Sequence, residues 1–198
     1  MRIETDLDGQ ERPVLEFTPF PKIGRLEKDM IVTEKIDGTN AAVVVTENGY
    51  VFAQSRTRVI TPGDDNYGFA RWVADHTDEL RDGLGEGVHF GEWWGKGIQR
   101  GYGLNEKRFS LFNTNRWTSD SNLSYDGISR RCIECSVCYV VPVLYEGQFD
   151  TDVVTTIYTG LRASGSWAAP GFMNPEGVVI FHTARGATFK LSDAKVGP

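Results

Sequence analysis

One stretch near the start of the chain constrains the fold more than any other. The sequence Glu34-Lys35-Ile36-Asp37-Gly38-Thr39-Asn40 stands between the strand-like runs 31–33 and 41–45. Apolar runs on both sides of an Asp-Gly pair are typical of a strand, a tight turn and a second strand, so we predict a hairpin with Lys35 at its edge. Apolar neighbours desolvate a lysine in part, which favours the neutral, nucleophilic form of its amine. The alternative is an ordinary hairpin with a solvated lysine.

The rest of the chain predicts one domain made mostly of strands. Apolar residues spaced three or four positions apart predict a helix over 66–84 and a second over 151–161. Asp64 or Asp65 can cap the first helix, and Asp150 the second. Further strand-like runs are expected at 49–54, 88–92, 109–113, 137–145, 178–181 and 187–192. Because no internal repeat or linker interrupts the pattern, residues 1–198 are expected to form a single domain.

Membrane association is not expected. No apolar run approaches the length that spans a bilayer, and the first residues are polar and acidic rather than basic and then apolar. We therefore expect no transmembrane segment, no signal peptide and no membrane partner. A cytoplasmic location is expected, and a monomer is favoured.

The charge distribution limits how the chain could bind a polyanion. The net charge of −6 argues against attraction of nucleic acid to the whole surface. Residues 1–84 hold 16 acidic and 10 basic side chains, whereas residues 85–198 hold 11 of each. A local patch in the second half is therefore expected, and Lys96 and Arg100, in the glycine-rich loop after Glu92, are the candidates for nucleic acid or phosphate. The basic residues that extend this candidate patch are Lys107, Arg108 and Arg116.

The three cysteines invite a metal interpretation. Cys132, Cys135 and Cys138 have Cys-x-x-Cys-x-x-Cys spacing, which is compatible with zinc. Structural zinc usually takes four ligands, and the nearest histidines, His89 and His182, are distant in sequence. Reduced cysteines beside a buried strand are therefore the favoured interpretation, with metal binding left open.

Two further patterns run along the whole chain. A glutamate stands at the end of a strand-like run three times, as Glu34, Glu92 and Glu176, and the basic residues at strand ends are Lys35, Arg56 and Lys190. Each one alone is typical of a solvated strand end. Together and in this order, from about residue 30 to 192, they resemble the covalent nucleotidyltransferase superfamily of RNA ligases, DNA ligases and messenger-RNA capping enzymes. The resemblance is closest to the ATP-dependent RNA ligases of bacteriophage type.

This resemblance implies a fold and a set of roles. The fold would be an α+β adenylation domain, in which antiparallel sheets flank a nucleotide cleft with a few helices. Lys35 would be the lysine that becomes adenylated, Lys190 would contact the α-phosphate, and Glu176 would help hold Mg²⁺ or Mn²⁺. Residues expected to contact ATP are Glu34, Ile36, Asn40, Arg56, Glu92 (on the ribose hydroxyls), Phe112 (stacked on adenine) and Lys190.

The expected activity is ATP-dependent RNA ligation through lysyl-AMP. AMP would pass from Lys35 to a 5′-phosphate end, and a 3′-hydroxyl would then seal the strand, with RNA as the favoured nucleic acid. The last motif departs from the family, which usually has two lysines one residue apart, because Thr188 and Ser192 flank Lys190 at that spacing; Lys195 is a possible substitute. The chain also ends shortly after this motif, so no accessory C-terminal domain is expected. The alternatives are a minimal DNA ligase, a capping-type nucleotidyltransferase, or an ATP-binding module that no longer ligates.

Overall fold

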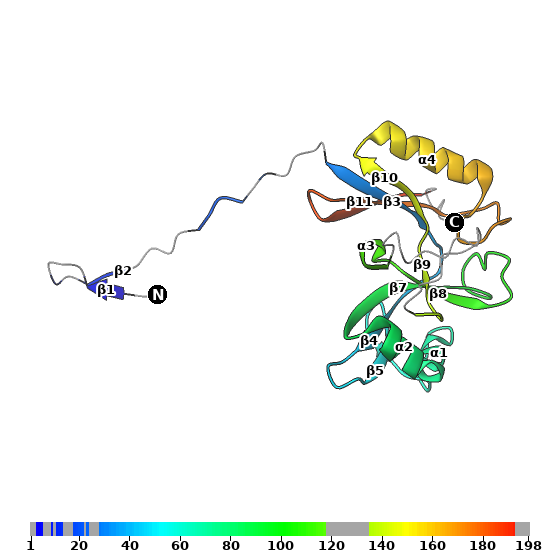
Figure 1. Cartoon of the computed structure of the whole chain (residues 1–198), viewed down its shortest axis with the longest axis horizontal. Coiled ribbons are helices and arrows are strands. Elements are labelled where there is room, and N and C mark those ends of the chain that lie inside the picture. Colours follow the sequence, from blue (N-terminus) through cyan, green and yellow to red (C-terminus); the bar gives the residue numbers. More distant parts are fainter. Residues whose placement is uncertain are drawn as a thin grey trace, which may run out of the picture.

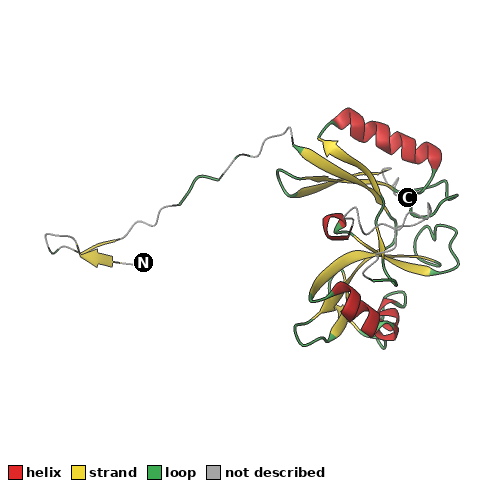
Figure 2. Cartoon of the chain, in the orientation of Figure 1, coloured by secondary structure: helices red, strands yellow, loops and turns green. Residues whose placement is uncertain are grey.

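The chain forms a six-stranded and a four-stranded β-sheet that face each other, and a separate two-stranded sheet near its start (Figure 1). The short helix at 114–117 lies between the two large sheets, and the other described helices lie on their outer sides. The computed structural model describes residues 3–5, 9, 11–13, 18–21, 23, 28–117 and 135–192. Helices and strands are mixed and most strand pairs are antiparallel, so the predicted α+β class is confirmed (Figure 2). The strands are β1 Ile3–Thr5, β2 Glu11–Pro13, β3 Asp29–Lys35, β4 Thr39–Val45, β5 Val51–Ser55, β6 Val59–Ile60, β7 Gly87–Gly95, β8 Lys107–Leu111, β9 Tyr139–Val140, β10 Val143–Gln148, β11 Gly177–His182 and β12 Ala187–Ser192. The helices are α1 Phe69–Asp75, α2 Thr77–Leu84, α3 Thr114–Trp117 and α4 Thr151–Ser164.

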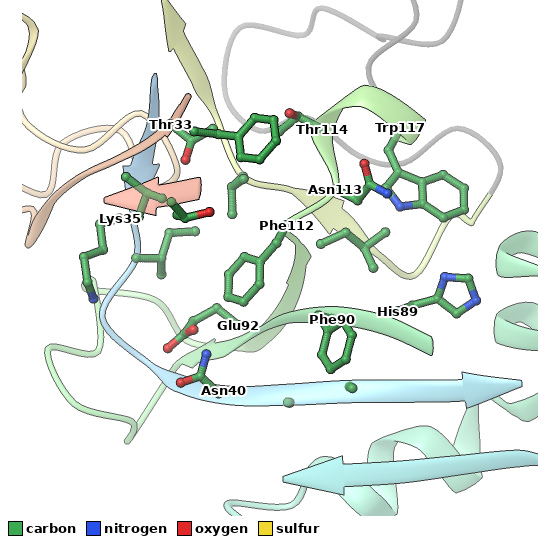
Figure 3. A pocket seen from close by; sticks show the side chains of 18 of the residues that line it. Thr33, Lys35, Asn40, His89, Phe90, Glu92, Phe112, Asn113, Thr114 and Trp117 are labelled. Atoms are coloured by element: carbon green, nitrogen blue, oxygen red, sulfur yellow. The ribbon is translucent and has the colours of Figure 1, made fainter. Parts of the chain in front are cut away.

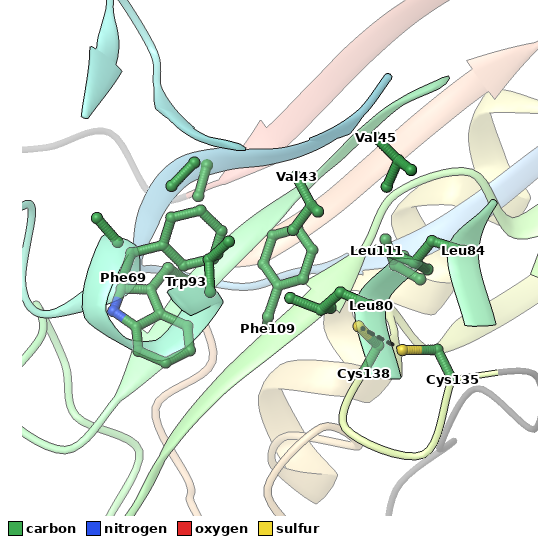
Figure 4. Packing of buried hydrophobic residues seen from close by; sticks show 14 of the residues in the cluster. Val43, Val45, Phe69, Leu80, Leu84, Trp93, Phe109, Leu111, Cys135 and Cys138 are labelled. Carbon is green, nitrogen blue, oxygen red and sulfur yellow. Dashed lines mark hydrogen bonds between the residues drawn. The ribbon is translucent and has the colours of Figure 1, made fainter. Parts of the chain in front are cut away.

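The larger sheet has six strands in the order β6-β5-β4-β7-β8-β9. Its pairs are antiparallel except for β8 and β9, which are parallel. One face packs against α1 and α2 through an aromatic cluster, in which Phe69 lies 5.3 Å from Trp93 and 5.1 Å from Phe109 between ring centroids (Figure 4). Burial of these rings holds the sheet and its helices together. The other face is left for the cavity described below.

The smaller sheet has four antiparallel strands in the order β10-β3-β11-β12, and α4 covers its outer face. Asp150 caps this helix as predicted, because its carboxylate accepts from the backbone N–H of Asp152 at 2.7 Å. Val154 and Leu161 of α4 pack against Met30 and Val32 of β3. The first half of the chain thus forms part of the same small core as the second half.

The predicted hairpin around Lys35 is wrong. β3 pairs with β10 and β11, whereas β4 pairs with β5 and β7 in the other sheet. Residues 36–38 are therefore a crossover between sheets rather than a hairpin turn. The prediction failed because apolar runs on both sides of Asp-Gly indicate two strands but not that they pair with each other. The crossover places Lys35 where the two sheets approach.

Two other predicted elements are interrupted. The helix expected over 66–84 is two short helices, because the backbone leaves helical geometry at His76 (φ −122°). The N-cap of α1 is Gly68 rather than Asp64 or Asp65, although the Asp65 carboxylate accepts from the first-turn N–H groups of Ala70 and Arg71. The strand expected over 137–145 is also split: β9 belongs to the larger sheet and β10 to the smaller one. Pro142, which has no N–H to donate, lies at the switch.

The described cysteines lie in the core of the larger sheet. Cys135 and Cys138 are buried, and the Cys135 thiol donates to Cys138 Sγ across 3.5 Å (Figure 4). Hydrogen bonding with Cys138 lowers the pKa of Cys135, because the Cys138 thiol can donate to the Cys135 thiolate, and burial acts in the opposite direction. Such a contact fits the favoured interpretation of reduced thiols. Cys132 lies outside the described residues.

Across the described ranges, none of the helices has the length and apolar character needed to cross a bilayer.

Candidate active site

A cavity of about 1150 Å³ lies between the inner faces of the two sheets (Figure 3). Alternate residues of a strand point to the same face, and this alternation selects the lining. The smaller sheet contributes Ile31, Thr33 and Lys35 from β3, Val179 and Phe181 from β11, and Thr188 and Lys190 from β12. The larger sheet contributes Asn40 and Ala42 from β4, Gln54 and Ser55 from β5, and Val88, Phe90 and Glu92 from β7, joined by Arg56 and Phe112. Lys35, Asn40 and Glu92 line the polar end, where the crossover enters, Phe90 and Phe112 line the middle, and His89 with residues 113–117 lines the far end (Figure 3).

Lys35 and Glu176 form an ion pair at the polar end of the cavity. Lys35 Nζ donates to Glu176 Oε2 at 2.6 Å, and the two side chains are 25% and 10% exposed. Their strands fix this approach, because Lys35 pairs with Gly177 across β3 and β11. The structure thus brings together two residues that are 141 positions apart in the sequence.

Glu92 enters the same end from the opposite sheet. Its Oε1 accepts from the N–H of Gly38 at 3.0 Å, and Asn40 is its partner across β4 and β7. Burial raises the pKa of Glu92 to about 7; the charges of Glu176 and Asp37 act in the same direction, and the Lys35 ammonium opposes them. Burial thus keeps Glu92 protonated to a higher pH than an ordinary glutamate.

Gly38 allows the crossover to approach β7 closely. A Cβ at this position would lie 2.5 Å from the carbonyl oxygen of Trp93 and 2.7 Å from Cβ of Trp94. Only glycine fits without moving backbone. The turn that carries Lys35 is therefore held directly against the strand that carries Glu92.

Glu34 and Ile36, the neighbours of Lys35, border the cavity but direct their side chains elsewhere. Both carboxylate oxygens of Glu34 are occupied: Oε1 accepts from Ser166 Oγ at 2.6 Å, and Oε2 accepts from the N–H groups of Trp167 and Ala168 at 2.7 and 2.8 Å. Burial raises the pKa of Glu34, and these hydrogen bonds oppose that rise. The side chains of Glu34 and Ile36 therefore do not point into the cavity, so the contacts expected with a nucleotide would have to involve their backbone atoms.

The remaining predicted cavity residues lie on three sides. Phe112 is 41% exposed and projects into the cavity from the end of β8, and Asn40 lies near Glu92 (Figure 3). Arg56 follows β5, and Lys190 lies on β12, where it pairs with Val179. Phe90, 62% exposed, also lines the cavity and was missed by the sequence analysis. Its position two residues before Glu92 on the same strand is the signal that could have found it.

The candidate basic patch has mostly internal partners. Arg100 donates to Asp37 at 2.9 Å, Lys107 to the carbonyl of Tyr67 at 2.5 Å, and Arg116 to the carbonyl of Leu84 at 2.7 Å. Arg108 pairs with Glu106 and lies over Tyr139. Lys96 is exposed. These partners do not support the expectation that Arg100 holds nucleic acid, whereas Lys96 stays a candidate.

The carboxylates at the polar end suit a hard divalent cation. Within residues 28–117 and 135–192, as in the shorter described segments, no three or more acidic, histidine or cysteine side chains are arranged to hold a metal. Mg²⁺ is commonly bound by one or two carboxylates together with substrate phosphates. Glu176 offers one such carboxylate, as the sequence predicted, and oxygen ligands suit Mg²⁺ and Mn²⁺.

Comparisons with known proteins agree with this fold. A variant of Naegleria gruberi RNA ligase solved with AMP and Mn matches with a TM-score of 0.58 at 18% identity, over 83% of this chain and 49% of that chain. A variant of that ligase solved with ATP and Mn gives the same values, and an apo variant gives a TM-score of 0.56 at 19% identity over 83% of this chain and 49% of that one. At this identity the likeness shows the fold, and the chain spans about half the length of those structures.

No curated protein matches the chain. The family model described as RNA ligase matches residues 28–192, which include both large sheets and every side chain placed around the cavity. This match covers most of the sequence, so the chain belongs to the RNA ligase family.

Proposed function

We propose that this chain is the catalytic part of an ATP-dependent RNA ligase that works through a lysyl-AMP intermediate on Lys35. The observation that carries the proposal is the meeting of Lys35, Glu176 and Glu92 at one end of a cavity in an RNA ligase family fold. The solved relatives that hold AMP or ATP with Mn support an adenine nucleotide and a divalent cation. The cavity is large enough for such a ligand, since small-molecule sites commonly measure about 300–1,000 Å³.

In the first step Lys35 attacks ATP. The neutral amine at Nζ forms a bond to the α-phosphorus and loses one proton to solvent, the bond from that phosphorus to the bridging oxygen breaks, and pyrophosphate leaves. Glu176 holds the amine at the cavity mouth before the reaction. Glu176 would help hold a divalent cation, and that cation would supply charge neutralisation to the phosphates.

The other cavity residues bind and orient the nucleotide. Lys190, from the smaller sheet, and Arg56, which follows β5 of the larger sheet, bring positive charge to the cavity, where it would stabilise the charge that develops during transfer. Phe112 offers an exposed ring for stacking on adenine, and Phe90 adds a second ring from β7. Glu92, as a carboxylate, accepts hydrogen bonds from the ribose hydroxyls.

The later steps move AMP to nucleic acid. The 5′-phosphate of one strand attacks the phosphorus of lysyl-AMP, which releases the Lys35 amine and forms an adenylated end. A 3′-hydroxyl then attacks the 5′-phosphate, and AMP leaves as the phosphodiester forms. Splitting the condensation in this way leaves each step to positioning and charge stabilisation.

A second candidate function is supported by the last motif. Thr188, Lys190 and Ser192 pair with alternate residues of β11, so they share one face of β12 and only one of them is cationic. A site with one fewer lysine for the phosphates favours an ATP-binding module that forms no sealed product. This alternative predicts ATP binding without transfer of AMP to a polynucleotide.

The test is incubation with α-labelled ATP and Mg²⁺ or Mn²⁺, followed by a denaturing gel. The expected result is a protein-bound label that acid releases and alkali does not, and that Lys35→Ala abolishes. Transfer from the isolated adenylate is then tested with nicked RNA, nicked DNA and GTP in place of ATP, which separates RNA ligase, DNA ligase and capping-type activities. ATP binding by a folded protein without label under either metal would overturn the ligase proposal in favour of the binding module.

A further inference from the structure

One guanidinium joins the two segments that carry Lys35 and Glu176. Arg100 lies in the loop between β7 and β8, and its Nε donates to Asp37 Oδ2 at 2.9 Å. Its terminal nitrogen donates to the carbonyl oxygen of Asn174 at 3.0 Å and to the side-chain oxygen of Asn174 at 3.1 Å. Asp37 is two residues after Lys35, and Asn174 is two residues before Glu176. Arg100 therefore spans the gap between the two partners of the ion pair.

The loop that presents Arg100 is itself held in a demanding conformation. Gln99 and Tyr102 have positive φ angles of 45° and 51°, which non-glycine residues adopt at a cost. Tyr102 is buried against Trp94 and Phe172, at 5.0 and 4.6 Å between ring centroids. Its hydroxyl accepts from the N–H of Asp37 at 2.8 Å. The loop thus holds Asp37 by its backbone as well as by its carboxylate.

We propose that Arg100 is a positioning residue that keeps Lys35 and Glu176 in register, and not a contact for nucleic acid. The pairing of Lys35 with Gly177 is the last pair of the β3–β11 ladder. Beyond it, residues 36–38 and the segment before Gly177 are no longer paired with each other in the sheet. Arg100 supplies the next cross-connection after the ladder ends. The consequence for catalysis rests on the proposed function, whereas the consequence for the ion pair does not.

Charge and shape both require arginine at this position. The guanidinium is a planar fork whose separate N–H groups reach Asp37 and Asn174 at the same time, whereas a lysine ammonium is a single point charge. The Arg100 and Asp37 side chains are 23% and 15% exposed, so the pair is partly shielded from water. Without the guanidinium the negative charge of Asp37 is unbalanced beside Glu92, and that charge already raises the pKa of Glu92.

The first experiment compares Arg100→Gln and Arg100→Lys with Arg81→Gln. Arg81 is the matched control, since it makes ion pairs with Asp78 and Asp82 on the outer surface of α2. The measurements are thermal unfolding and the single-turnover rate of lysyl-AMP formation between pH 6 and 9. Arg100→Gln is expected to slow the reaction at least about 30-fold, a change equivalent to about 2 kcal/mol in the barrier. The acid limb of the pH profile is expected to move to higher pH.

Arg100→Lys separates the role of the positive charge from that of the bridge between Asp37 and Asn174. Arg100→Lys is expected to restore the position of the acid limb but not the rate, because it returns the charge without the fork. A rate for Arg100→Gln equal to that of Arg81→Gln would overturn the proposal. So would normal lysyl-AMP formation with weaker RNA binding and a shallower salt dependence, which would assign Arg100 to a phosphate contact.

A second measurement does not depend on ligase activity. Acetylation of Lys35 by a small amine-acylating ester is followed by mass spectrometry in the nucleotide-free protein. Arg100→Gln is expected to speed modification of Lys35 several-fold, because the amine is no longer held against Glu176, while Lys96 reacts at the wild-type rate. Equal Lys35 reactivity in both proteins would overturn the positioning role. A wild type that forms no lysyl-AMP but shows this difference would refute the proposed function alone.

Discussion

The two faces of β3 differ in what surrounds them, although their residues alternate along one strand. Met30, Val32 and Glu34 lie on the face that packs against α4 and the loop that follows it, and Glu34 is only 1% exposed. Thr33 and Lys35 lie on the other face and line the cavity. Two charged neighbours therefore have opposite roles. Glu34 fixes the strand through buried hydrogen bonds, and that anchor holds Lys35 where it can react.

The largest expected effect is the loss of covalent labelling when Lys35, on the cavity face of β3, is replaced. Lys35→Met removes the amine that forms the phosphoramidate, so covalent labelling by α-labelled ATP is expected to vanish under both metals. The variant is expected to stay folded, since the side chain it replaces is at the cavity mouth and not in the core. Circular dichroism and urea unfolding check the fold. Residual label at another lysine would contradict the reactive role given to the cavity face of β3, because the nucleophile would then lie elsewhere.

The next largest effect is a loss of stability when Glu34, on the packed face of β3, is replaced. Glu34→Ala leaves the donors of Ser166, Trp167 and Ala168 without their acceptor, and it is expected to lower the free energy of unfolding by about 3–5 kcal/mol. Urea unfolding measures this loss. Glu47→Ala, at an exposed turn, is the control and is expected to change stability by less than about 0.5 kcal/mol. A loss of stability for Glu34→Ala no larger than that for Glu47→Ala would mean that the buried hydrogen bonds of Glu34 do not anchor β3.

A third prediction extends the comparison to the carboxylate across the cavity. The pKa of Glu92 is about 7 in the folded chain against an ordinary value of 4.5, so the folded state binds this proton more tightly than the unfolded chain. Its contribution to stability is complete below about pH 4.5 and is lost as the pH rises through about 7.

Glu92→Gln keeps the shape and an acceptor for Gly38 but does not ionise. It is expected to be more stable than wild type at pH 8 by up to about 3 kcal/mol, with much of that advantage absent at pH 5. Urea unfolding at the two pH values measures the difference. An advantage of equal size at both would show that Glu92 has an ordinary pKa.

The smallest expected effect is on ATP binding when Phe112 or Phe90, the exposed rings that line the cavity, is replaced. Phe112→Ala is expected to weaken ATP binding by about 1–2 kcal/mol, the lower part of the range of about 1–3 kcal/mol found for stacking of one base on an aromatic ring. Phe90→Ala tests the second ring in the same titration, and a smaller loss is expected because Phe90 is the more exposed of the two. Phe52→Ala is the control, since Phe52 is 46% exposed and is not among the residues that line the cavity. Equal losses for Phe112 and Phe52 would contradict stacking in the cavity.

Local patterns in the sequence predicted much of the fold. The apolar spacing of 151–161 and the cap at Asp150 identified α4, and the strand-like runs 41–45 and 49–54 identified β4 and β5. The order of Lys35, Glu92 and Glu176 along the chain led to the family that the match over residues 28–192 shows. The helix and the strands could be predicted because each depends on residues that are close in sequence, and the family could be because the order of its motifs lies along the chain itself.

The tertiary structure alone decided how those elements meet. Alternation along β3 predicts that Glu34 and Lys35 point to opposite faces, but not which face is packed. That choice depends on Ser166, 132 positions away from Glu34. The split of 137–145 between two sheets and the crossover at 36–38 depend likewise on strand partners from distant parts of the chain.

Arg100 shows the same limit at a single side chain. In the sequence it is a basic residue in a glycine-rich loop, a pattern shared by phosphate-binding arginines. In the structure Asp37 and Asn174, 63 and 74 positions away, take its hydrogen bonds. The sequence by itself determined which groups could react and in what order they occur. Long-range pairing and burial decided which of them face the cavity, because those free energies exist only once distant segments are in contact.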